Sequence, residues 1–334
     1  MLKPSLLVPR IAPMLAIAAL MGATVLAEVA LAQQAQTADS GEIYVLPVHG
    51  NVSMLVGAGA NITLQVGSQG VLLVDTGNGK LSDKILAAVR KLSDKPIRVI
   101  INTSAGPDHV GGNESIANAG ITVIGSVVGY SSGDVQHGAT IMAHENTFNR
   151  MNGTIHGEPA WPSGAWPTDP YSVGPKKLFS NDEGIEIIHL PAAHTDGDSI
   201  VFFRRSDVIS AGDILVTTSY PVIDLQRSGS IQGIIDGLNR ILDLTIAEQE
   251  VEGGTYVIPG HGRICDQFDV LEYRDMVVIV RDRIQDLIKK NKSLEEIKAT
   301  HPTEDYDARY GATTGPWTTD MFVEAVYKSL LTAK

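Results

Sequence analysis

Four short segments that carry histidine and aspartate side chains constrain the fold of this chain more than any other sequence feature. They contain Asp108, His109, His194, Asp213 and His261. The apolar runs that precede them, at residues 98–101, 185–190, 208–210 and 255–258, predict strands. Because strand ends gather at one edge of a layered fold, we expect these distant side chains to converge.

Strand-forming runs occur in two groups, and helical patterns follow each group. The first group, at residues 43–48, 52–56, 62–66 and 71–74, is punctuated by Gly and Asn and predicts an antiparallel meander. Its last run is apolar throughout, which predicts a central strand covered on both faces. Further strands are expected at 121–124, 177–179 and 200–204, and helices at 81–92, 109–119, 230–244 and beyond 267, with a break around 301–316.

Two β-rich halves packed face to face, with helices outside, make a four-layer α/β/β/α sandwich. The composition is 43% hydrophobic and 19% charged over 334 residues, which is ordinary for a globular protein and does not select this arrangement over other α/β folds. Residues 152–175, rich in Gly, Pro and Trp, predict a long loop. Such a loop either packs on the surface or faces a substrate.

The first 32 residues predict a secretory signal peptide. Lys3 and Arg10 give a basic start, residues 11–26 are almost wholly apolar, and Ala32 ends a small-x-small cleavage site. An uncleaved membrane anchor is the alternative. We therefore expect a signal peptide at 1–32, a main domain at 33–290, a helical extension at 291–334 packed on that domain, and a periplasmic or secreted location.

The formal charge narrows the range of partners. It is −12 for the whole chain, and it becomes −13 once Lys3, Arg10 and Glu28 leave with the signal peptide. An acidic protein without a basic stripe repels nucleic acid and anionic membrane surfaces, so we expect a small-molecule substrate. The oligomeric state is left open. The lone Cys265 cannot form an internal disulfide, so stability must come from a packed core.

The residue types in the four segments are those that bind metal ions. Imidazoles together with two carboxylates suit a borderline divalent cation such as zinc, iron or manganese. The carboxylates also neutralise the charge of a dication, which lowers the cost of burying it.

The order and spacing of these segments resemble the motifs of the metallo-β-lactamase superfamily. The matching segments are Asn102-Thr103-Ser104-Ala105-Gly106-Pro107-Asp108-His109-Val110-Gly111-Gly112, Ala193-His194-Thr195, Gly212-Asp213 and Pro259-Gly260-His261-Gly262, preceded by Leu73-Val74-Asp75-Thr76-Gly77. The resemblance covers roughly residues 43–265 and implies the α/β/β/α sandwich. It also implies that Asp108, His109 and His261 hold a second metal and that Asp213 bridges it to a first metal held with His194.

One part of the family pattern is missing. Ser104 and Gly106 stand where the family has the first two histidines of its His-x-His-x-Asp-His motif. The first metal site therefore keeps only His194 and the shared Asp213, whereas the second is complete. The resemblance implies one ion in the second site, Zn²⁺ in the first place, with Fe or Mn as alternatives. Asp213 is more similar to the residue of lactonase and glyoxalase II branches than to that of β-lactamases proper.

The implied activity is metal-assisted hydrolysis by an exported enzyme. A metal-bound hydroxide would attack an ester, lactone, amide or phosphoester, since a bound dication lowers the pKa of its water toward ~7. We assign catalytic roles to Asp108 and His194, the latter as proton relay or oxyanion support. A binding protein that kept the fold and lost catalysis is the alternative. An iron-dependent oxidoreductase ranks last, since it would rely on the depleted first site.

Structural roles compete with functional ones at several positions. Asp108 is also a good helix N-cap, and Asp213 is typical of a turn. Asp75 and Asp198 are expected to hold loops through backbone hydrogen bonds. His144 is considered only as a compensating ligand for the missing first-site histidines.

Overall fold

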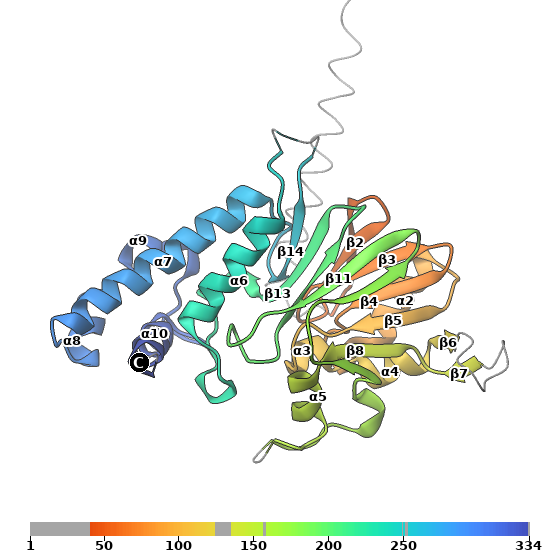
Figure 1. Cartoon of the computed structure of the whole chain (residues 1–334), viewed down its shortest axis with the longest axis horizontal. Helices are drawn as coiled ribbons and strands as arrows, with labels where there is room; N and C mark the ends of the chain where they lie inside the picture. The colour runs from red at the N-terminus through yellow and green to blue at the C-terminus, as the bar shows by residue number, and fades with distance from the viewer. Residues whose placement is uncertain (1–40, 124–134, 156–157, 249, 251–252, 333–334) are drawn as a thin grey trace, which may run out of the picture.

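Two β-sheets stacked face to face form the centre of the molecule in the computed structural model (Figure 1). The structure describes residues 41–123, 135–155, 158–248, 250 and 253–332. The predicted signal peptide at residues 1–32 lies outside the described residues, and so does the end of the predicted strand 121–124.

The first sheet has seven strands in the order β1-β2-β3-β4-β5-β8-β9. They are β1 Tyr44–His49, β2 Val52–Val56, β3 Ile62–Gly67, β4 Gly70–Val74, β5 Ile97–Ile101, β8 Thr140–His144 and β9 Asp169–Tyr171. β1 to β4 pair antiparallel in sequence order, which confirms the predicted meander. β4, β5, β8 and β9 pair parallel, so their carboxyl ends lie at one edge of the sheet.

The second sheet has five strands in sequence order, β10 to β14. They are β10 Lys176–Ser180, β11 Glu183–His189, β12 Ser199–Phe203, β13 Val208–Val216 and β14 Tyr256–His261. β10 to β13 pair antiparallel, and β13 pairs parallel with β14. A small separate sheet joins β6 Ile121–Val123 and β7 Val135–His137.

Apolar side chains fill the space between the two sheets. Met54, Leu72 and Val74 of the first sheet share one cluster with Ile187 and Phe203 of the second, and none is more than 1% exposed. Because side chains alternate along a strand, the neighbours of Leu72 and Val74 point to the opposite face. The continuous apolar run at 71–74 is therefore buried on both sides, as its sequence predicts.

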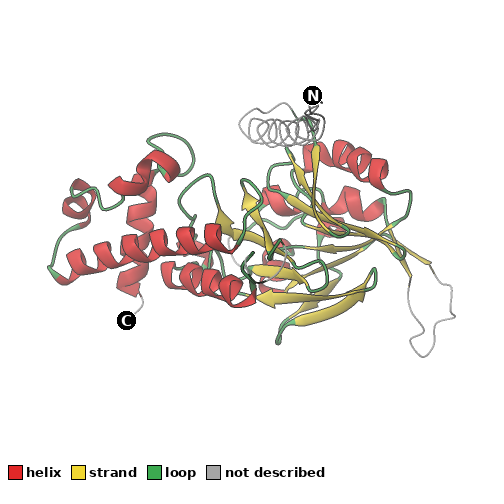
Figure 2. Cartoon of the chain, turned by 90° about the horizontal axis from the view of Figure 1, so that it is seen from above, coloured by secondary structure: helices red, strands yellow, loops and turns green. Residues whose placement is uncertain are grey.

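Helices cover the outer face of each sheet (Figure 2). They are α2 Ser82–Leu92, α3 Pro107–Val110, α4 Asn113–Asn118, α5 Glu145–Met151, α6 Ile231–Leu244, α7 Gln267–Lys289, α8 Leu294–Ala299, α9 Glu304–Tyr310 and α10 Thr319–Thr332, with 3₁₀ turns η1 Gly79–Leu81, η2 Ser163–Ala165 and η3 Leu225–Arg227. Ile85 of α2 and Ile116 of α4 belong to the same hydrophobic cluster as Leu73, and residues of α6 and α7 belong to the same cluster as Ile209. The four-layer α/β/β/α sandwich is thus confirmed.

The helix predicted at 109–119 is two helices, because a glycine pair lets the chain pass close to other backbone. A Cβ at Gly111 would lie 2.5 Å from the Pro107 carbonyl oxygen, and one at Gly112 would lie 2.4 Å from the Thr76 carbonyl oxygen. The prediction over 152–175 is also partly wrong. This stretch holds η2 and β9, and β9 completes the edge of the first sheet by pairing with β8.

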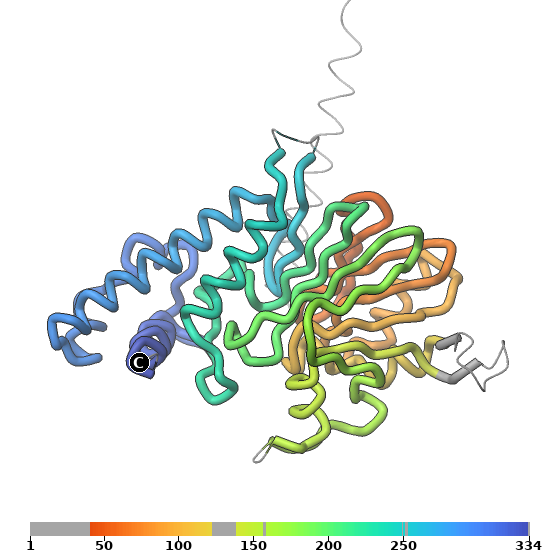
Figure 3. The backbone as a smooth tube through the Cα atoms, viewed as in Figure 1, coloured from red at the N-terminus to blue at the C-terminus, as the bar shows by residue number. Residues whose placement is uncertain are grey.

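The C-terminal helices share the hydrophobic core of the second half of the chain. Ile297 of α8 and Phe322 of α10 are fully buried in the cluster that also contains Val277 of α7. The tube in Figure 3 shows α10, in dark blue, beside the lower end of α6. The domain boundaries at residues 32 and 290 stay a prediction. Among the described residues no helix has the length and apolar character needed to span a membrane.

Replacing Leu73 with Ala tests the two-sided burial of β4. Leu73 is 0% exposed, whereas Leu92 at the end of α2 is 45% exposed. We expect Leu73→Ala to lower the free energy of unfolding by about 2–5 kcal/mol through lost burial and the cavity left behind. The matched variant Leu92→Ala should change it by less than about 1 kcal/mol. Urea unfolding measures both, and equal losses would contradict the packing described.

Candidate metal centre

All five predicted site residues converge at the rim of the sandwich, around the carboxylate of Asp213. His109 Nε2 lies 3.1 Å from Asp213 Oδ2, and His194 Nε2 lies 3.8 Å from the same oxygen. His261 Nε2 lies 3.7 Å from Asp213 Oδ1 and 3.1 Å from Asp108 Oδ2. Segments more than 150 residues apart in the sequence therefore meet, although the role of each side chain stays a prediction.

Each side chain reaches the rim from a short helix, a loop or a strand end. Asp108 and His109 lie in α3, which follows β5, and no side chain caps this helix, so Asp108 does not act as its N-cap. β13 extends to Val216 and not only to residue 210 as predicted, so Asp213 lies inside a strand and not in the turn that was the structural alternative to a ligand role. His261 is the last residue of β14.

Two glycines allow the close approach of β13 and β14 at Asp213. Gly212 has φ +52°, in the left-handed region, and the strand register shifts beside it. A Cβ at Gly260 would lie 2.4 Å from Asp213 Oδ1. A side chain at position 260 would therefore collide with the Asp213 carboxylate.

His109 is fully buried and its ring orientation is set by Asp75. The His109 Nδ1–H donates to Asp75 Oδ2 at 2.7 Å, and the same carboxylate accepts the Thr103 hydroxyl at 2.6 Å and the Thr103 backbone N–H at 2.8 Å. Because a carboxylate only accepts, Nδ1 carries the proton and Nε2 faces Asp213. This is the arrangement by which a carboxylate orients a metal-binding histidine, and it gives Asp75 the loop-holding role that the sequence predicts.

His194 is held in a similar way from the other side. Its Nδ1–H donates to the Val222 carbonyl oxygen at 2.9 Å, which leaves Nε2 facing Asp213. The His194 carbonyl oxygen accepts the Asp224 backbone N–H at 3.0 Å. The segment that carries Val222 is anchored by Tyr220, whose ring stacks on Phe322 of α10 with centroids 4.6 Å apart.

The donor set fits a divalent cation. One ligand atom from each of Asp108, His109 and His261 lies within 4.8 Å of the others. Among the described residues, His109 Nε2 and Asp213 Oδ1 are buried and make no hydrogen bond, despite the short distance from His109 Nε2 to the other Asp213 oxygen. Buried polar atoms in proteins are nearly always satisfied, so two orphaned atoms of metal-ligating type at one point indicate an ion site.

The charges of the cluster shift the pKa values of His109 and Asp213. Burial alone would lower the pKa of His109, but the carboxylates of Asp213 and Asp75 raise it well above its usual value. Burial likewise opposes ionisation of Asp213, yet the charges of His109, His194 and His261 hold its pKa below the usual range. A dication bound at this point would compete with protons for the histidine nitrogens, so its binding would weaken in acid.

Ser104 and Gly106, which stand where the family motif has histidines, lie close to Asp108 and His109. Ser104 is 1% exposed, and its Oγ accepts the Gly106 N–H at 3.2 Å. A Cβ at Gly106 would lie 3.0 Å from His109 Cδ2 and 3.2 Å from Asp108 Oδ1. This spacing is tighter than ordinary van der Waals contact, so a side chain at position 106 would require His109 or Asp108 to shift by a few tenths of an ångström.

Other candidates from the sequence lie outside this cluster. His144 stacks on His189 with ring centroids 3.4 Å apart, and it belongs to no group of ligand atoms in the described part of the chain, so it does not replace a lost ligand. Asp198 accepts the Thr195 backbone N–H at 2.6 Å and its hydroxyl at 2.7 Å. It therefore holds the turn after His194, as predicted, while burial raises its pKa to about 6.

A network of charged side chains beside His194 escaped the sequence-based search. Arg150 is 5% exposed and pairs with Asp196 at 2.7 Å and with Glu158 at 2.5 Å. Glu158 also pairs with Arg227 at 3.1 Å, which ties α5 to the segments on both sides of the site. Arginine and carboxylate residues scattered over 77 positions give no sequence motif, so only the tertiary structure reveals this network.

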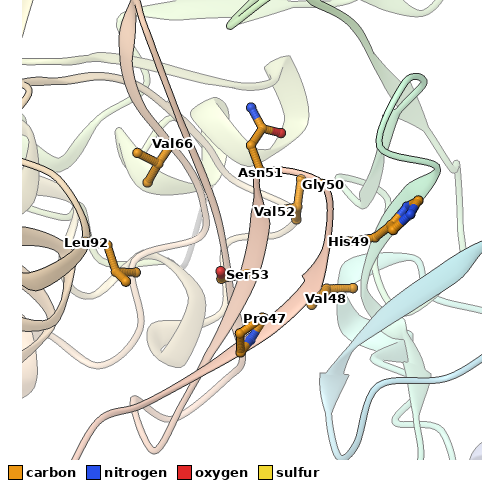
Figure 4. A pocket seen from close by; sticks show the side chains of 9 residues that line it. All are labelled: Pro47, Val48, His49, Gly50, Asn51, Val52, Ser53, Val66 and Leu92. Atoms are coloured by element: carbon orange, nitrogen blue, oxygen red, sulfur yellow. The ribbon is translucent and has the colours of Figure 1, made fainter.

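Another pocket, of about 420 Å³, lies on the β1–β2 hairpin (Figure 4). It is lined mainly by the turn at His49–Asn51 and by apolar residues such as Val66 and Leu92. His49 Nδ1–H donates to the Ser206 carbonyl oxygen at 2.6 Å. The pocket shares no residue with the cluster around Asp213.

A sandwich with aspartate and histidine residues at its rim defines a class, and comparison with known proteins names it. Residues 55–261 match the family described as the metallo-β-lactamase superfamily. This match covers more than half of the chain, so the chain belongs to that superfamily.

Similar proteins include alkylsulfatases and metallo-β-lactamases. A linear primary-alkylsulfatase from Pseudomonas sp. (strain ATCC 19151) is 49% identical over 45 residues, which are 13% of this chain and 8% of that protein. The structure of the stereoselective inverting sec-alkylsulfatase Pisa1 from Pseudomonas sp. is similar with TM-score 0.60 and 14% identity, covering 87% of this chain and 51% of that one. A metallo-β-lactamase from Pontibacter korlensis has TM-score 0.53 and 13% identity, over 71% and 99% respectively. The chain thus spans about half the length of the solved alkylsulfatase, and the structural likenesses show the fold.

The His144–His189 stack makes the fold sensitive to acid. Burial and the neighbouring His189 lower the pKa of His144 to about 4, below its unfolded value of about 6.5. The unfolded chain therefore binds more protons between these values, and the free energy of unfolding falls as the pH is lowered from about 6.5 to about 4. His144→Phe keeps the ring and should lose less stability on acidification, as followed by urea unfolding at about pH 7 and about pH 5. An unchanged pH dependence would contradict this, and the exposed His301→Gln is the control.

Proposed function

We propose that this protein is a metal-dependent hydrolase that binds one ion, Zn²⁺ in the first place, through Asp108, His109, Asp213 and His261. The observation that carries the proposal is the pair of buried, hydrogen-bond-free ligand atoms, His109 Nε2 and Asp213 Oδ1, beside the contact between His261 and Asp108. A structural role would leave these atoms satisfied by protein partners.

The four proposed ligands hold the ion, and some side chains of the cluster also face the space where the reactants would bind. A divalent cation at such a site polarises a substrate oxygen and lowers the pKa of water. Asp108 and His261 have side chains 39% and 34% exposed, so they reach the solvent side of the cluster. The Asp108 carboxylate can accept a hydrogen bond from an attacking water and orient it. His194 Nε2, 3.8 Å from Asp213, can take up a proton and return it to the leaving group.

Esters of an acid are the substrate class that the comparisons favour. The family resemblance predicts carboxylic esters, lactones, amides or phosphoesters as substrates. Two of the similar proteins are named as alkylsulfatases, so we add sulfate esters to these candidates. Export to the periplasm or the exterior is part of the proposal and rests on the sequence of residues 1–32. A binding protein without catalysis is the alternative.

Metal content decides between the enzyme and the binding protein. We expect about one zinc, iron or manganese ion per mature chain by elemental analysis, because one complete ligand set is present. Asp108→Ala should reduce the bound metal strongly, whereas Asp83→Ala, which removes an exposed carboxylate of α2, should leave it unchanged. A chain free of metal after reconstitution would favour the binding protein.

Replacing His194 tests whether this residue acts in catalysis and not in metal binding. If His194 transfers a proton, His194→Gln should lower kcat by about 10²- to 10⁴-fold on an ester that the protein hydrolyses, while the metal content stays near that of the parent protein. The assay uses reporter sulfate, phosphate and carboxylic esters, and elemental analysis of the same samples is the control. Full activity in His194→Gln would show that this histidine is a relic of the first metal site.

A further inference from the structure

A pocket of about 520 Å³ lies beside Asp108 and is lined by one cationic and one aromatic side chain. The 3₁₀ turn η1 contributes Lys80, α3 contributes Pro107 and Asp108, and the segment before η2 contributes Trp161. The pocket shares Asp108 with the metal-ligand group, so a molecule bound in it lies next to the proposed reaction centre.

The backbone that carries Lys80 is held rigidly. The Lys80 backbone N–H donates to the Asn78 side chain at 3.1 Å, and the Asn78 backbone N–H donates to the Ala58 carbonyl oxygen at 2.6 Å. A Cβ at Gly79 would lie 2.4 Å from the Gly111 carbonyl oxygen, so the turn packs directly on the end of α3. The base of the Lys80 side chain is thereby fixed relative to Asp108.

The ammonium group of Lys80 is available to bind a ligand. Its side chain is exposed, and among the described residues no carboxylate forms an ion pair with it, although many other lysine residues of the chain are paired in this way. Of the described residues that line the pocket, Lys80 is the only one with a cationic side chain. In a chain of formal charge −12, an unpaired ammonium beside the site favours a bound anion locally.

Trp161 provides an apolar wall that is anchored to the metal loop. Its half-buried ring packs against the cluster of Ala105, Val110 and Met151, and its backbone N–H donates to the Met151 carbonyl oxygen at 2.8 Å. Ala105 and Val110 flank the segment that carries Asp108 and His109. The ring therefore packs on the loop that carries the candidate ligands, and where it lines the pocket it can cover an alkyl or aryl group.

We infer that this pocket selects amphiphilic organic anions, with the anionic group beside Lys80 and the apolar portion against Trp161. The inference rests on the proposed function for the location of the reaction and deepens it by naming the substrate class as a monoester of a strong acid with an alkyl or aryl group. Lys80 and Trp161 are then specificity-determining residues, outside the set that binds the ion.

Binding of a non-hydrolysable analogue tests the pocket without any turnover. Octyl sulfonate and an uncharged octyl glycoside are titrated into the metal-loaded and the metal-free mature protein by calorimetry. We expect Lys80→Met to weaken sulfonate binding about threefold to tenfold and to leave the glycoside unchanged, because one partly screened charge pair is lost. Trp161→Phe should retain most of the binding of both, and Trp161→Ala should weaken both about tenfold or more. Lys84→Met, four residues along on α2, is the control of equal charge and should change neither.

The inference is overturned if Lys80→Met and Lys84→Met bind the sulfonate equally well, or if neither Trp161 variant changes the affinity. A hydrolytic assay on octyl sulfate then distinguishes the two claims. Sulfonate binding that depends on Lys80, without hydrolysis of any ester, would leave the pocket in place and overturn the proposed function. Hydrolysis with the same KM in Lys80→Met and in the parent protein would support the function and overturn the assignment of the pocket.

Discussion

The buried position of His109 between the carboxylates of Asp75 and Asp213 is the constraint on which the rest of the site depends. Removing an imidazole and two carboxylates from water is costly unless each is paired. Asp75 is satisfied by His109 and Thr103, whereas Asp213 keeps one oxygen without a hydrogen bond. The fold therefore concentrates negative charge at a point where a cation restores the balance.

The second half of the chain supports this point through the loop before α6. Val222 accepts the Nδ1–H of His194, and Tyr220, two residues earlier, is fixed between Phe322 and the polar end of α9. The Tyr220 hydroxyl donates to Asp307 Oδ1 at 2.8 Å. The C-terminal helices thus contribute to the orientation of His194 although they supply no residue to the site. Loss of their packing would loosen a side chain that lies in a different layer of the sandwich.

Ser104 and Gly106, in place of two histidines of the family motif, affect both the space and the charge balance of the site. The space that a side chain at position 106 would need is bounded by His109, Asp108 and Ser104. A single dication is also the charge that the two carboxylates Asp108 and Asp213 neutralise. The proposed single ion is consistent with this charge, and the unpaired Lys80 at the neighbouring pocket is the group that we propose attracts an anionic substrate.

The strands and several helices could be predicted from local sequence patterns, whereas the four-layer sandwich and the roles of the converging residues were predicted from the resemblance to the metallo-β-lactamase superfamily. The apolar run at 71–74, the glycine-punctuated meander and the helical pattern at 230–244 act over short stretches of sequence, and the Asp and His segments follow strands whose ends are expected to share an edge. Only the tertiary structure decided that Asp213 lies inside β13, that β9 belongs to the first sheet, and that Arg150 meets Asp196. These features depend on contacts between segments that are distant in the sequence, where strand pairing and burial outweigh the preferences of single residues.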